Sequence, residues 1–434
     1  MFRKPLSYIC LLLVVSACGG NARYPESAGI GPTPALPATR DALIPVVNIA
    51  TAVGWPAGAT PVAAAGLRVA AFASGLDHPR WLYVLPNGDV LVAETNAQPS
   101  KPKGIKARIQ QSVMKRAGAA VPSADRISLL RDADGDGIAE IQTVLLSGLT
   151  SPFGMALIDD HLYIANTDSV VSVPYSPGAT EISAPTTLLA ALPANPPNYH
   201  WTKNLLASPD GSKLYVASGS NSDHGERGMA SEDGRAAVLE IDRASGETRL
   251  FASGLRNPVG MAWEPESGVL WVSVNERDEL GGDLVPDYMT AVVDGGFYGW
   301  PYSYYGRNLD PRVADQRPDL VASARVPDYA LGAHTASLGL AFAHGNVLGP
   351  AYQNGAFVGQ HGSWNRDPRS GYKVIFVPFR NGRPAGMPLD VLSGFLNDKG
   401  AAQGRPVGVA IDQTGALLVA DDVGNTIWRV TRSR

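Results

Sequence analysis

Basic side chains recur at one position of a pattern that repeats along the chain. In each copy a basic or polar residue, often beside proline, precedes an apolar run, a tight turn and a second apolar run. Positively charged hydrogen-bond donors bind a compact polyanion strongly where they converge in a narrow cleft from which water is partly excluded. The alternative is that basic side chains beside turns simply point into water. The residues that open the copies are Arg80, Ser151, His200 with Lys203, Arg256 with Asn257, His334 and Arg405.

The repeat itself predicts the elements that position these residues. Each copy reads as two short β runs around a turn such as Asn87-Gly88 or Asp210-Gly211. Further alternating runs, such as residues 127–130, lie between the copies. Six copies of four strands predict an all-β fold, a six-bladed β-propeller with long inserted loops. The loops that enter the inner strands of a propeller meet at one mouth, so we expect the opening residues to converge there.

The two ends of the propeller are expected to meet in one blade. Residues 426–430 supply a third strand after the last copy, and residues 67–72 offer a strand before the first copy. An N-terminal strand that completes the last blade would remove open sheet edges. We therefore expect one propeller domain over residues 66–434, closed by an N-terminal strand. A pair of β-sandwiches is the rival fold, but it leaves the sixfold pattern unexplained.

Composition excludes several classes of function. The net charge of −4 and the pI near 6.0 predict no nucleic-acid-binding face, which would be strongly basic. The only cysteines are Cys10 and Cys18, so the chain beyond them has no disulfide and no thiolate metal site. Phosphate-loop and dinucleotide motifs are absent from the sequence, which argues against nucleotide and nicotinamide chemistry.

The first residues read as an export signal. Arg3 and Lys4 precede a short apolar run over residues 6–15, and the segment VSAC ending at Cys18 resembles the lipobox of bacterial lipoproteins. The resemblance implies a signal peptide over residues 1–18, lipidation of Cys18, and an exported protein anchored to the bacterial membrane, facing the periplasm or the cell exterior. An ordinary signal peptide that contains a cysteine is the alternative. Residues 19–65, rich in proline and alanine, are predicted to be a tether.

Several longer motifs resemble one enzyme family. They are PRWLYVLPNG (79–88), HWTKNL (200–205), GLRNP (254–258), NERDE (275–279), YGWP (298–301) and HGSWNR (361–366). Together they resemble the pyrroloquinoline quinone (PQQ)-dependent glucose/sorbosone dehydrogenases, including the pyranose dehydrogenase propellers, over roughly residues 67–430. The resemblance implies oxidation of a sugar or a sugar-derived aldehyde by hydride transfer to PQQ, with a separate electron acceptor.

The resemblance also implies roles for single residues. His200 matches the base that takes a proton from the substrate hydroxyl, and Arg256 matches the arginine that polarises the quinone carbonyl. Asn257 matches a hydrogen-bonding partner of the cofactor. Arg405 matches one of two arginines for the cofactor carboxylates, whereas Val407 stands near the place of the second. The remaining candidates for cofactor binding are Arg80, Lys203 and His334 at the mouth, and His361 or Arg366 in place of the family's lysine on the fifth blade.

Two segments are candidate calcium sites. In glucose-oxidising members of the family, calcium bridges the cofactor and a loop that corresponds here to residues 275–279, which makes Glu276 and Arg277 the predicted metal residues. A solvated acidic loop is the alternative reading. The second candidate is the run of Asp132, Asp134 and Asp136, which resembles the start of a calcium loop but has Thr143 at the twelfth position. A strand-linking turn is the preferred reading there, with calcium as an option.

Two other functions remain open from sequence. A calcium-dependent lactonase-type propeller would need acidic residues at the openings of the copies, where this chain has basic ones. A non-catalytic surface propeller that binds glycans or a protein partner would need no catalytic base. Addition of PQQ and calcium to the purified protein would discriminate, since only the dehydrogenase predicts a bound quinone spectrum.

Overall fold

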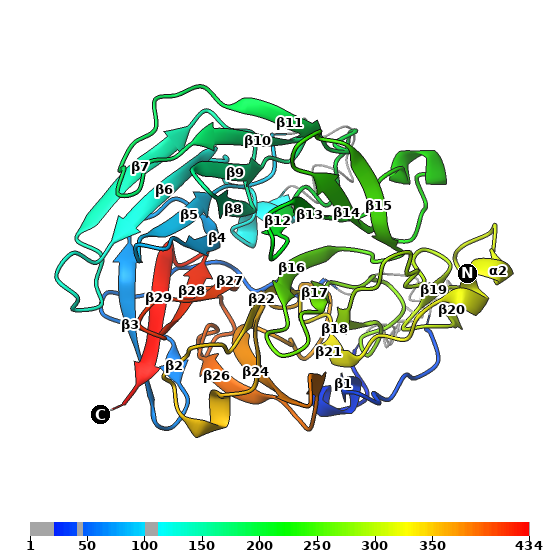
Figure 1. Ribbon diagram of the computed structural model, residues 1–434. Coiled ribbons are helices and arrows are strands. Elements are labelled where there is room, and N and C mark those ends of the chain that lie inside the picture. The colour runs from blue at the N-terminus through cyan, green and yellow to red at the C-terminus, as the bar shows by residue number, and fades with distance from the viewer. Residues whose placement is uncertain (1–20, 41–46, 100–111, 434) are drawn as a thin grey trace, which may run out of the picture.

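The computed structural model describes residues 21–40, 47–99 and 112–433. Nearly all regular structure in these residues is β, in six sheets arranged in a ring (Figure 1). The predicted six-bladed β-propeller is therefore confirmed. The expected signal peptide and Cys18 lie outside the described residues. Within them, no helix has both the length and the apolar character needed to cross a bilayer.

Blades 1 to 3 are four-stranded sheets whose strands follow one another in chain order. Blade 1 contains β4 (Pro79–Val84), β5 (Val90–Glu94), β6 (Arg126–Arg131) and β7 (Ile141–Ser147). Blade 2 contains β8 (Met155–Ile158), β9 (His161–Ala165), β10 (Ser169–Pro174) and β11 (Thr187–Ala191). Blade 3 contains β12 (Lys203–Ala207), β13 (Lys213–Ser218), β14 (Ala237–Asp242) and β15 (Thr248–Ser253).

Blades 4 to 6 include strands from the N-terminal part of the chain. Blade 4 contains β16 (Pro258–Trp263), β17 (Leu270–Val274), β18 (Pro286–Ala291), β21 (Tyr329–Ala333) and β1 (Ile30–Gly31). Blade 5 contains β22 (Ser337–Phe342), β23 (Gly355–Gln360), β24 (Lys373–Arg380), β26 (Leu389–Ser393) and β2 (Val62–Ala63), with β25 (Arg383–Pro384) paired to β24. Blade 6 contains β27 (Pro406–Ile411), β28 (Leu417–Asp421), β29 (Thr426–Arg432) and β3 (Leu67–Ser74).

The innermost strands of neighbouring blades lie side by side around the central axis. Contacts run from β4 to β8, β12, β16, β22 and β27 and back to β4. Glycines in these strands permit the close approach: a β carbon at Gly154 in blade 2 would collide with the backbone of Leu205 in blade 3. A β carbon at Gly339 would collide with the carbonyl oxygen of Val407 in the same way. The small residue that recurs early in the repeat therefore closes the ring.

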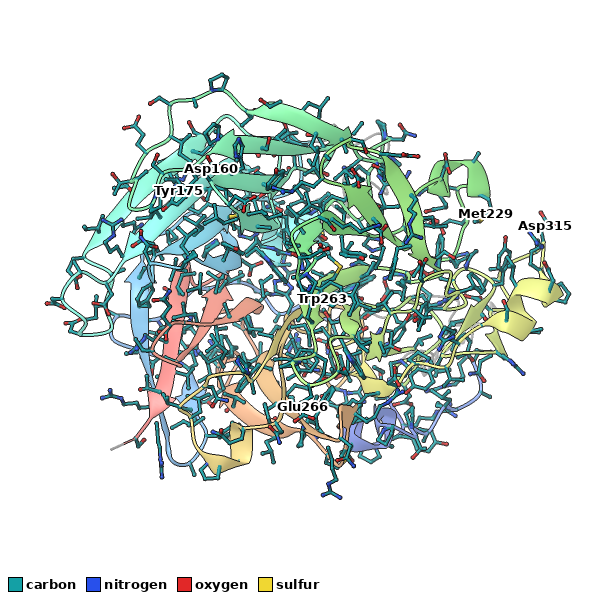
Figure 2. The ribbon with its side chains drawn as sticks, in the orientation of Figure 1. Asp160, Tyr175, Met229, Trp263, Glu266 and Asp315 are labelled. Atoms are coloured by element: carbon teal, nitrogen blue, oxygen red, sulfur yellow. The ribbon has the colours of Figure 1, made fainter. Side chains whose placement is uncertain are left out.

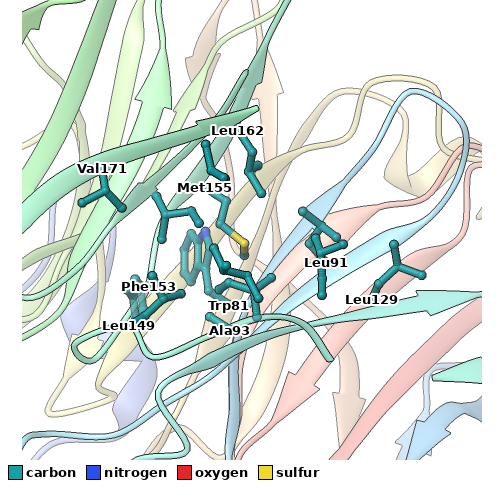
Figure 3. Packing of buried hydrophobic residues seen from close by; sticks show 14 of the residues in the cluster. Trp81, Leu91, Ala93, Leu129, Leu149, Phe153, Met155, Leu162 and Val171 are labelled. Atoms are coloured by element: carbon teal, nitrogen blue, oxygen red, sulfur yellow. The ribbon is translucent and has the colours of Figure 1, made fainter. Parts of the chain in front are cut away.

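Apolar side chains from adjacent blades fill the space between the sheets. Trp81 and Leu91 of blade 1 pack with Phe153 and Met155, which stand at the start of blade 2 (Figure 3). The rings of Trp81 and Phe153 have centroids 4.9 Å apart. Further clusters of buried apolar side chains lie between the other pairs of neighbouring blades. Burial of these faces holds the ring together without a disulfide among the described residues.

The sixth blade combines the last three strands of the chain with β3. Strand β3 pairs antiparallel with β29, from Ser74 opposite Thr426 to Leu67 opposite Arg432. A segment that precedes the first blade thus forms the outer strand of the sixth. This pairing joins the two ends of the propeller by backbone hydrogen bonds.

Residues 21–40 and 47–65 differ from the expected tether. They lie along blades 4 to 6, where β1 pairs with β21 and β2 pairs with β26. Trp55 donates a hydrogen bond from its indole nitrogen to Asp421 over 2.7 Å, and Ala50 is fully buried. The tether prediction is therefore wrong for the described part of this segment. We name residues 21–40 and 47–65 the N-terminal strap.

The remaining elements are short and lie in connections. They are the 3₁₀ turns η1 (Glu26–Gly29), η2 (Met229–Glu232) and η3 (Pro350–Tyr352), the strand pair β19 (Ser303–Tyr304) and β20 (Asn308–Leu309), and the helix α2 (Pro318–Ser323). Two insertions that carry some of them lie at the periphery, where Met229 and Asp315 are labelled (Figure 2). The first lies between β13 and β14, and the second lies between β18 and β21. Long insertions were expected from the wide spacing of the repeat.

Candidate functional site

The mouth of the propeller is the end at which the inner strands begin. Because the inner strand and the second strand of a blade are antiparallel, the second strand ends at this same face. Residues just before an inner strand and residues just after a second strand therefore meet there. The structure brings most of the predicted residues together at this face, in two groups.

His200 leads the first group, at the opening of blade 3. Its Nδ1 lies 2.8 Å from the carbonyl oxygen of Ser220, which follows strand β13. A carbonyl can only accept a hydrogen bond, so Nδ1 carries the proton and Nε2 is left as the basic nitrogen. Among the described residues Nε2 has no hydrogen-bond partner, and the ring is half-buried.

The surroundings of His200 favour its neutral form. Burial lowers the pKa of His200 well below its usual value, and the nearby charge of Arg256 lowers it further. Lys203, three residues later, is fully buried at the start of β12, and its amine is 3.5 Å from the carbonyl oxygen of His200. Burial, together with the charge of Arg235, lowers the pKa of the Lys203 amine well below its usual value. Both groups are therefore favoured in their neutral forms, which are the forms that can accept a proton.

Arg256 lies beside His200 and is held by oxygen atoms on several sides. Its Nη2 donates to the carboxylate of Asp223 over 2.6 Å, and its Nε donates to the carbonyl of the same residue. Its Nη1 donates to the carbonyls of Asn275 and Glu276, at 3.3 and 2.8 Å. A guanidinium has five N–H groups, so these four bonds leave one N–H of Nη2 without a hydrogen bond, and the carboxylate of Asp278 stands 3.7 Å from that nitrogen. Burial works against the charge of Arg256, but Asp223 and Asp278 outweigh it and raise the pKa of the guanidinium.

Asn257 completes the first group. It is buried, and its side-chain oxygen has no hydrogen-bond partner among the described residues. A β carbon at Gly219 would collide with that oxygen and with the side chain of His200. Glycine at position 219 therefore lets His200 and Asn257 approach the same stretch of backbone. A buried polar atom without a partner is costly, which is the state expected of a group that hydrogen-bonds a ligand.

The second group surrounds Asp422, which follows strand β28 of blade 6. Arg80 donates to its carboxylate over 2.5 Å, and Nε2 of His361 lies 2.9 Å from the same oxygen. His78 contributes a contact between Nδ1 and the carbonyl oxygen of Asp422 at 3.0 Å. Burial acts to raise the pKa of Asp422, but His361, His78 and Arg80 outweigh it and hold that pKa below its usual range. Burial lowers the pKa of His361 to about 4, against the attraction of Asp422.

Arg405 lies at the opening of blade 6, close to this second group. Its guanidinium donates to the carbonyl of Ala50 in the N-terminal strap over 3.1 Å and stands 5.2 Å from the ring centre of Tyr372. The Nε atoms of both Arg405 and Arg80 are buried without a hydrogen-bond partner among the described residues. Two guanidinium groups with free donors suit a ligand that carries carboxylates.

Two of the predicted cofactor residues belong to neither group and are held by the loop that follows β17. Arg366 donates to the carbonyls of Gly282 and Pro368 and is part of the contact with the N-terminal strap. His334 donates from Nε2 to the carbonyl of Gly281 over 3.0 Å and stands 3.5 Å from Asp278. Burial lowers the pKa of His334, but the hydrogen bond and charge of Asp278 outweigh it and raise that pKa.

The loop 275–279 does not fit the calcium site expected of it. Nε of Arg277 is 3.0 Å from the carboxylate of Glu276, and Arg277 is completely buried. The guanidinium also donates to the carbonyls of Pro301 and Ser303. Glu276 and Arg277 therefore pair with each other instead of presenting oxygen atoms to a cation.

The other calcium candidate forms a turn at the far end of blade 1. The carboxylates of Asp132, Asp134, Asp136 and Glu140 have oxygen atoms within 4.8 Å of one another. The loop joins β6 to β7 at the end opposite the mouth, and Asp132 accepts hydrogen bonds from the amides of Gly135 and Gly137. This arrangement agrees with the strand-linking turn, and the calcium option stays a prediction.

The sequence-based reasoning missed Asp223, Asp422 and Arg312. Asp422 follows directly on β28, and polar residues also follow the second strands of other blades, as Asn166 follows β9 and Asn275 follows β17, which was a signal available in the repeat. Asp223 also follows a second strand, a few residues beyond β13. Arg312 belongs to the insertion between β18 and β21 and had no signal, because only the folded insertion brings its guanidinium to Asp223, at 3.2 Å.

Comparisons with known proteins agree with this fold. A model of the TrAA12-like family matches residues 123–288 and 314–433, more than half of the chain. The PQQ domain of pyranose dehydrogenase from Coprinopsis cinerea, in its holo form, superposes with a TM-score of 0.69 at 20% identity, over 89% of this chain and 100% of that one. The calcium structure of the carbohydrate-active enzyme family AA12 from Trichoderma reesei has the same TM-score at 18% identity, over 89% and 99% of the two chains.

One curated relative is similar over a shorter stretch. The aldose sugar dehydrogenase YliI of Escherichia coli is 29% identical over 120 residues, which cover 27% of this chain and 30% of that protein. The matched part is thus less than a third of either sequence. The family model and this relative agree with the family that the motifs resemble, and the two structures agree with its fold.

Proposed function

The protein belongs to the TrAA12-like family, and on that premise we propose that it oxidises a sugar or a sugar-derived aldehyde with PQQ as the electron-accepting cofactor. The observation that carries the proposal is the arrangement of His200 and Arg256. A neutral imidazole with a free Nε2 stands beside a buried, permanently charged guanidinium with one N–H to spare. These are a proton acceptor and an electrostatic stabiliser for the removal of hydride from a hydroxyl-bearing carbon.

The residues present fit the cofactor. PQQ carries carboxylates, and the free donors of Arg80 and Arg405 suit such groups. Asn257 offers a buried, unpartnered oxygen to a hydrogen-bond donor on the cofactor. When bound, PQQ would supply the quinone that accepts the hydride.

The chain's own residues would perform the proton chemistry. Nε2 of His200 takes the proton of the substrate hydroxyl, while the carbonyl of Ser220 fixes the ring by holding Nδ1–H. The remaining N–H of Arg256 stabilises negative charge that develops beside it. Because Asp223 and the carbonyls of the 275–276 segment hold Arg256, the guanidinium needs no rearrangement during the reaction.

The environment of His200 also suits a sugar. Tyr199 is 37% exposed, and its ring meets the His200 ring edge-on, with centroids 4.7 Å apart. A partly exposed aromatic ring beside the base, with the Arg227 guanidinium 5.5 Å from its centre, offers apolar surface to the C–H bonds of a sugar ring. A lactonase would need carboxylates free to hold a metal, whereas Asp223 and Asp422 are both engaged by arginine. The site therefore favours the dehydrogenase over the lactonase.

We also propose that the protein is exported and lipid-anchored. The support is the apolar run ahead of Ser16, Ala17 and Cys18. Cys18→Ser should move the protein from the membrane fraction to the soluble fraction on cell fractionation. A variant that stays in the membrane fraction would argue against this anchor.

The catalytic proposal is tested by dye-linked turnover. Purified protein is incubated with PQQ and assayed for dye reduction on a panel of aldoses and ketoaldehydes. We expect turnover on a member of the panel, and a loss on the order of a hundredfold to ten-thousandfold in His200→Ala. His344→Ala is the control, because His344 is exposed and lies in the connection from β22 to β23, at the end opposite the mouth. Normal turnover in His200→Ala would refute the assigned base, and no turnover in the wild type would favour a binding propeller.

A further inference from the structure

The loop 275–279 is held by two arginines through its backbone oxygens. Arg256 donates to the carbonyls of Asn275 and Glu276, at 3.3 and 2.8 Å. Arg312 donates to the carbonyl of Asp278 over 2.9 Å. Three carbonyls that a hard cation could use are therefore occupied by guanidinium N–H groups.

The carboxylates around this loop are paired as well. Asp223 accepts from Arg256 over 2.6 Å and from Arg312 over 3.2 Å. Asp310, which is fully buried, lies 2.8 Å from Arg312 and 3.2 Å from Arg277. The result is one continuous chain of alternating charge, in the order Glu276, Arg277, Asp310, Arg312, Asp223 and Arg256.

Asp278 adds a branch to this chain. Its carboxylate accepts from Asn365 over 2.7 Å and stands 3.5 Å from His334 and 3.7 Å from Arg256. Four carboxylates thus lie against three guanidinium groups and one imidazole, while Asp287 accepts from the amide of Glu276 and Glu279 is exposed at the end of the loop. A divalent cation placed among these pairs would be repelled by the guanidinium groups that already hold the carboxylates.

We propose that Arg256 and Arg312 take the place of a metal ion at the loop 275–279, so that neither the loop nor PQQ binding at the mouth requires calcium there. Arg312 is then a positioning residue, because it reaches the site through Asp223 and the carbonyl of Asp278. It comes from the insertion between β18 and β21, so this peripheral segment supports the mouth. The part that concerns PQQ rests on the proposed function, and the part that concerns the metal does not.

The first test compares PQQ binding with and without calcium. Wild-type protein is freed of metal with a chelator, and the dissociation constant of PQQ is measured by quenching of tryptophan fluorescence. We expect added calcium to change this constant by less than about threefold, or 0.7 kcal/mol at 1.4 kcal/mol per factor of ten. A larger gain in affinity would overturn the proposal. Failure to bind PQQ under either condition would instead refute the proposed function.

The second test needs no cofactor. The melting temperature of the metal-free protein is measured with and without calcium in a background that carries Asp134→Asn and Asp136→Asn, which disables the exposed acidic turn of blade 1. We expect no shift in this background. Addition of Arg312→Gln to this background should create a calcium-dependent rise in the melting temperature. The substitution frees the carbonyl of Asp278 and removes the guanidinium that lies between the carboxylates of Asp223 and Asp310.

The matched control is Arg317→Gln, which removes an exposed arginine of the same insertion that pairs with Asp319 at the surface. The control should behave like its parent, with or without calcium. The proposal would be overturned if calcium raised the melting temperature of the parent protein, with Asp134→Asn and Asp136→Asn alone, and if Asp278→Asn abolished that rise. Such a result would show that the loop itself binds the metal. If Arg312→Gln does not fold, the parent and its Asp278→Asn derivative still decide the question.

Discussion

Replacement of Trp55 by alanine should lower the free energy of unfolding by about 4 kcal/mol. The indole nitrogen donates to Asp421 over 2.7 Å, and the ring meets those of Phe395 and Trp428 edge-on, with centroids at 5.6 and 5.4 Å. Truncation of a large aromatic side chain in a packed site costs about 3–5 kcal/mol. Because Trp55 is only half-buried, we expect the loss of packing to cost about 3 kcal/mol, at the lower end of that range.

The hydrogen bond to Asp421 adds a smaller amount. Loss of one donor to a buried acceptor costs about 1–3 kcal/mol. Asp421 keeps the indole N–H of Trp428 and the backbone amides of Arg405 and Gly424, so the cost is about 1 kcal/mol. Trp55→Phe retains most of the ring and should therefore lose only about 1 kcal/mol.

The assay is urea unfolding followed by far-ultraviolet circular dichroism, because removal of a tryptophan alters the fluorescence signal. Val53→Ala is the control in the same strap: Val53 is 57% exposed, and its truncation should stay within about 0.5 kcal/mol of the wild type. If Trp55→Ala behaved like Val53→Ala, the strap would not be packed on the propeller, and the tether expected from sequence would be correct.

Three further predictions follow from the inner strands and the mouth. Gly154→Ala should destabilise the protein by about 1–3 kcal/mol or more, because its β carbon meets the backbone of Leu205; an unchanged melting temperature would contradict the close packing of the inner strands. The decline of kcat/KM on the acid side should occur below pH 6.5, because burial lowers the pKa of His200. The base therefore stays neutral as the pH falls through 6.5 and is protonated only at lower pH. A decline that begins at or above pH 6.5 would contradict the assignment of His200 as the base. Asp422→Asn should cost about 3–5 kcal/mol in urea unfolding at neutral pH, since it leaves the buried charge of Arg80 unpaired; a loss below 1 kcal/mol would show that the pair is solvated.

The blades were predictable because they repeat. A run such as residues 200–207 shows an opening polar group and an apolar strand in a pattern that returns around the ring, and burial on both faces of each sheet demands that pattern. His200, Arg256 and Arg405 could be placed for the same reason, because the opening of an inner strand always faces the mouth. The repeat thus predicted where these three side chains lie in the fold, and the family resemblance suggested the role of each in the reaction.

The N-terminal strap was not predictable in the same way. Its contacts are made mainly by backbone groups and single side chains, as where Ala50 accepts from Arg405 and Asn48 donates to the carbonyl of Arg366. Such contacts leave neither a hydrophobic period nor a charge pattern in the sequence. A segment rich in proline and alanine therefore reads as a linker even where it is packed.

The calcium prediction for the loop 275–279 counted charged residues without their partners. Carboxylates at Glu276 and Asp278 indicate a cation site only if they are free. In the folded chain Arg277 pairs with the first, and Asn365 and His334 hold the second. Arg312 reaches the same loop from more than thirty residues away, which no local pattern could indicate.

Equilibrium titration of the metal-free protein with PQQ is the direct test of cofactor binding at the mouth. We expect saturable binding of one equivalent to the wild type and nearly the same affinity in His200→Ala, because that residue acts on the substrate proton. Arg405→Ala should weaken binding at least tenfold, because its guanidinium is one of two with free donors for the cofactor carboxylates. Absence of saturable binding to the wild type, or equal affinity in Arg405→Ala, would refute PQQ binding at this site.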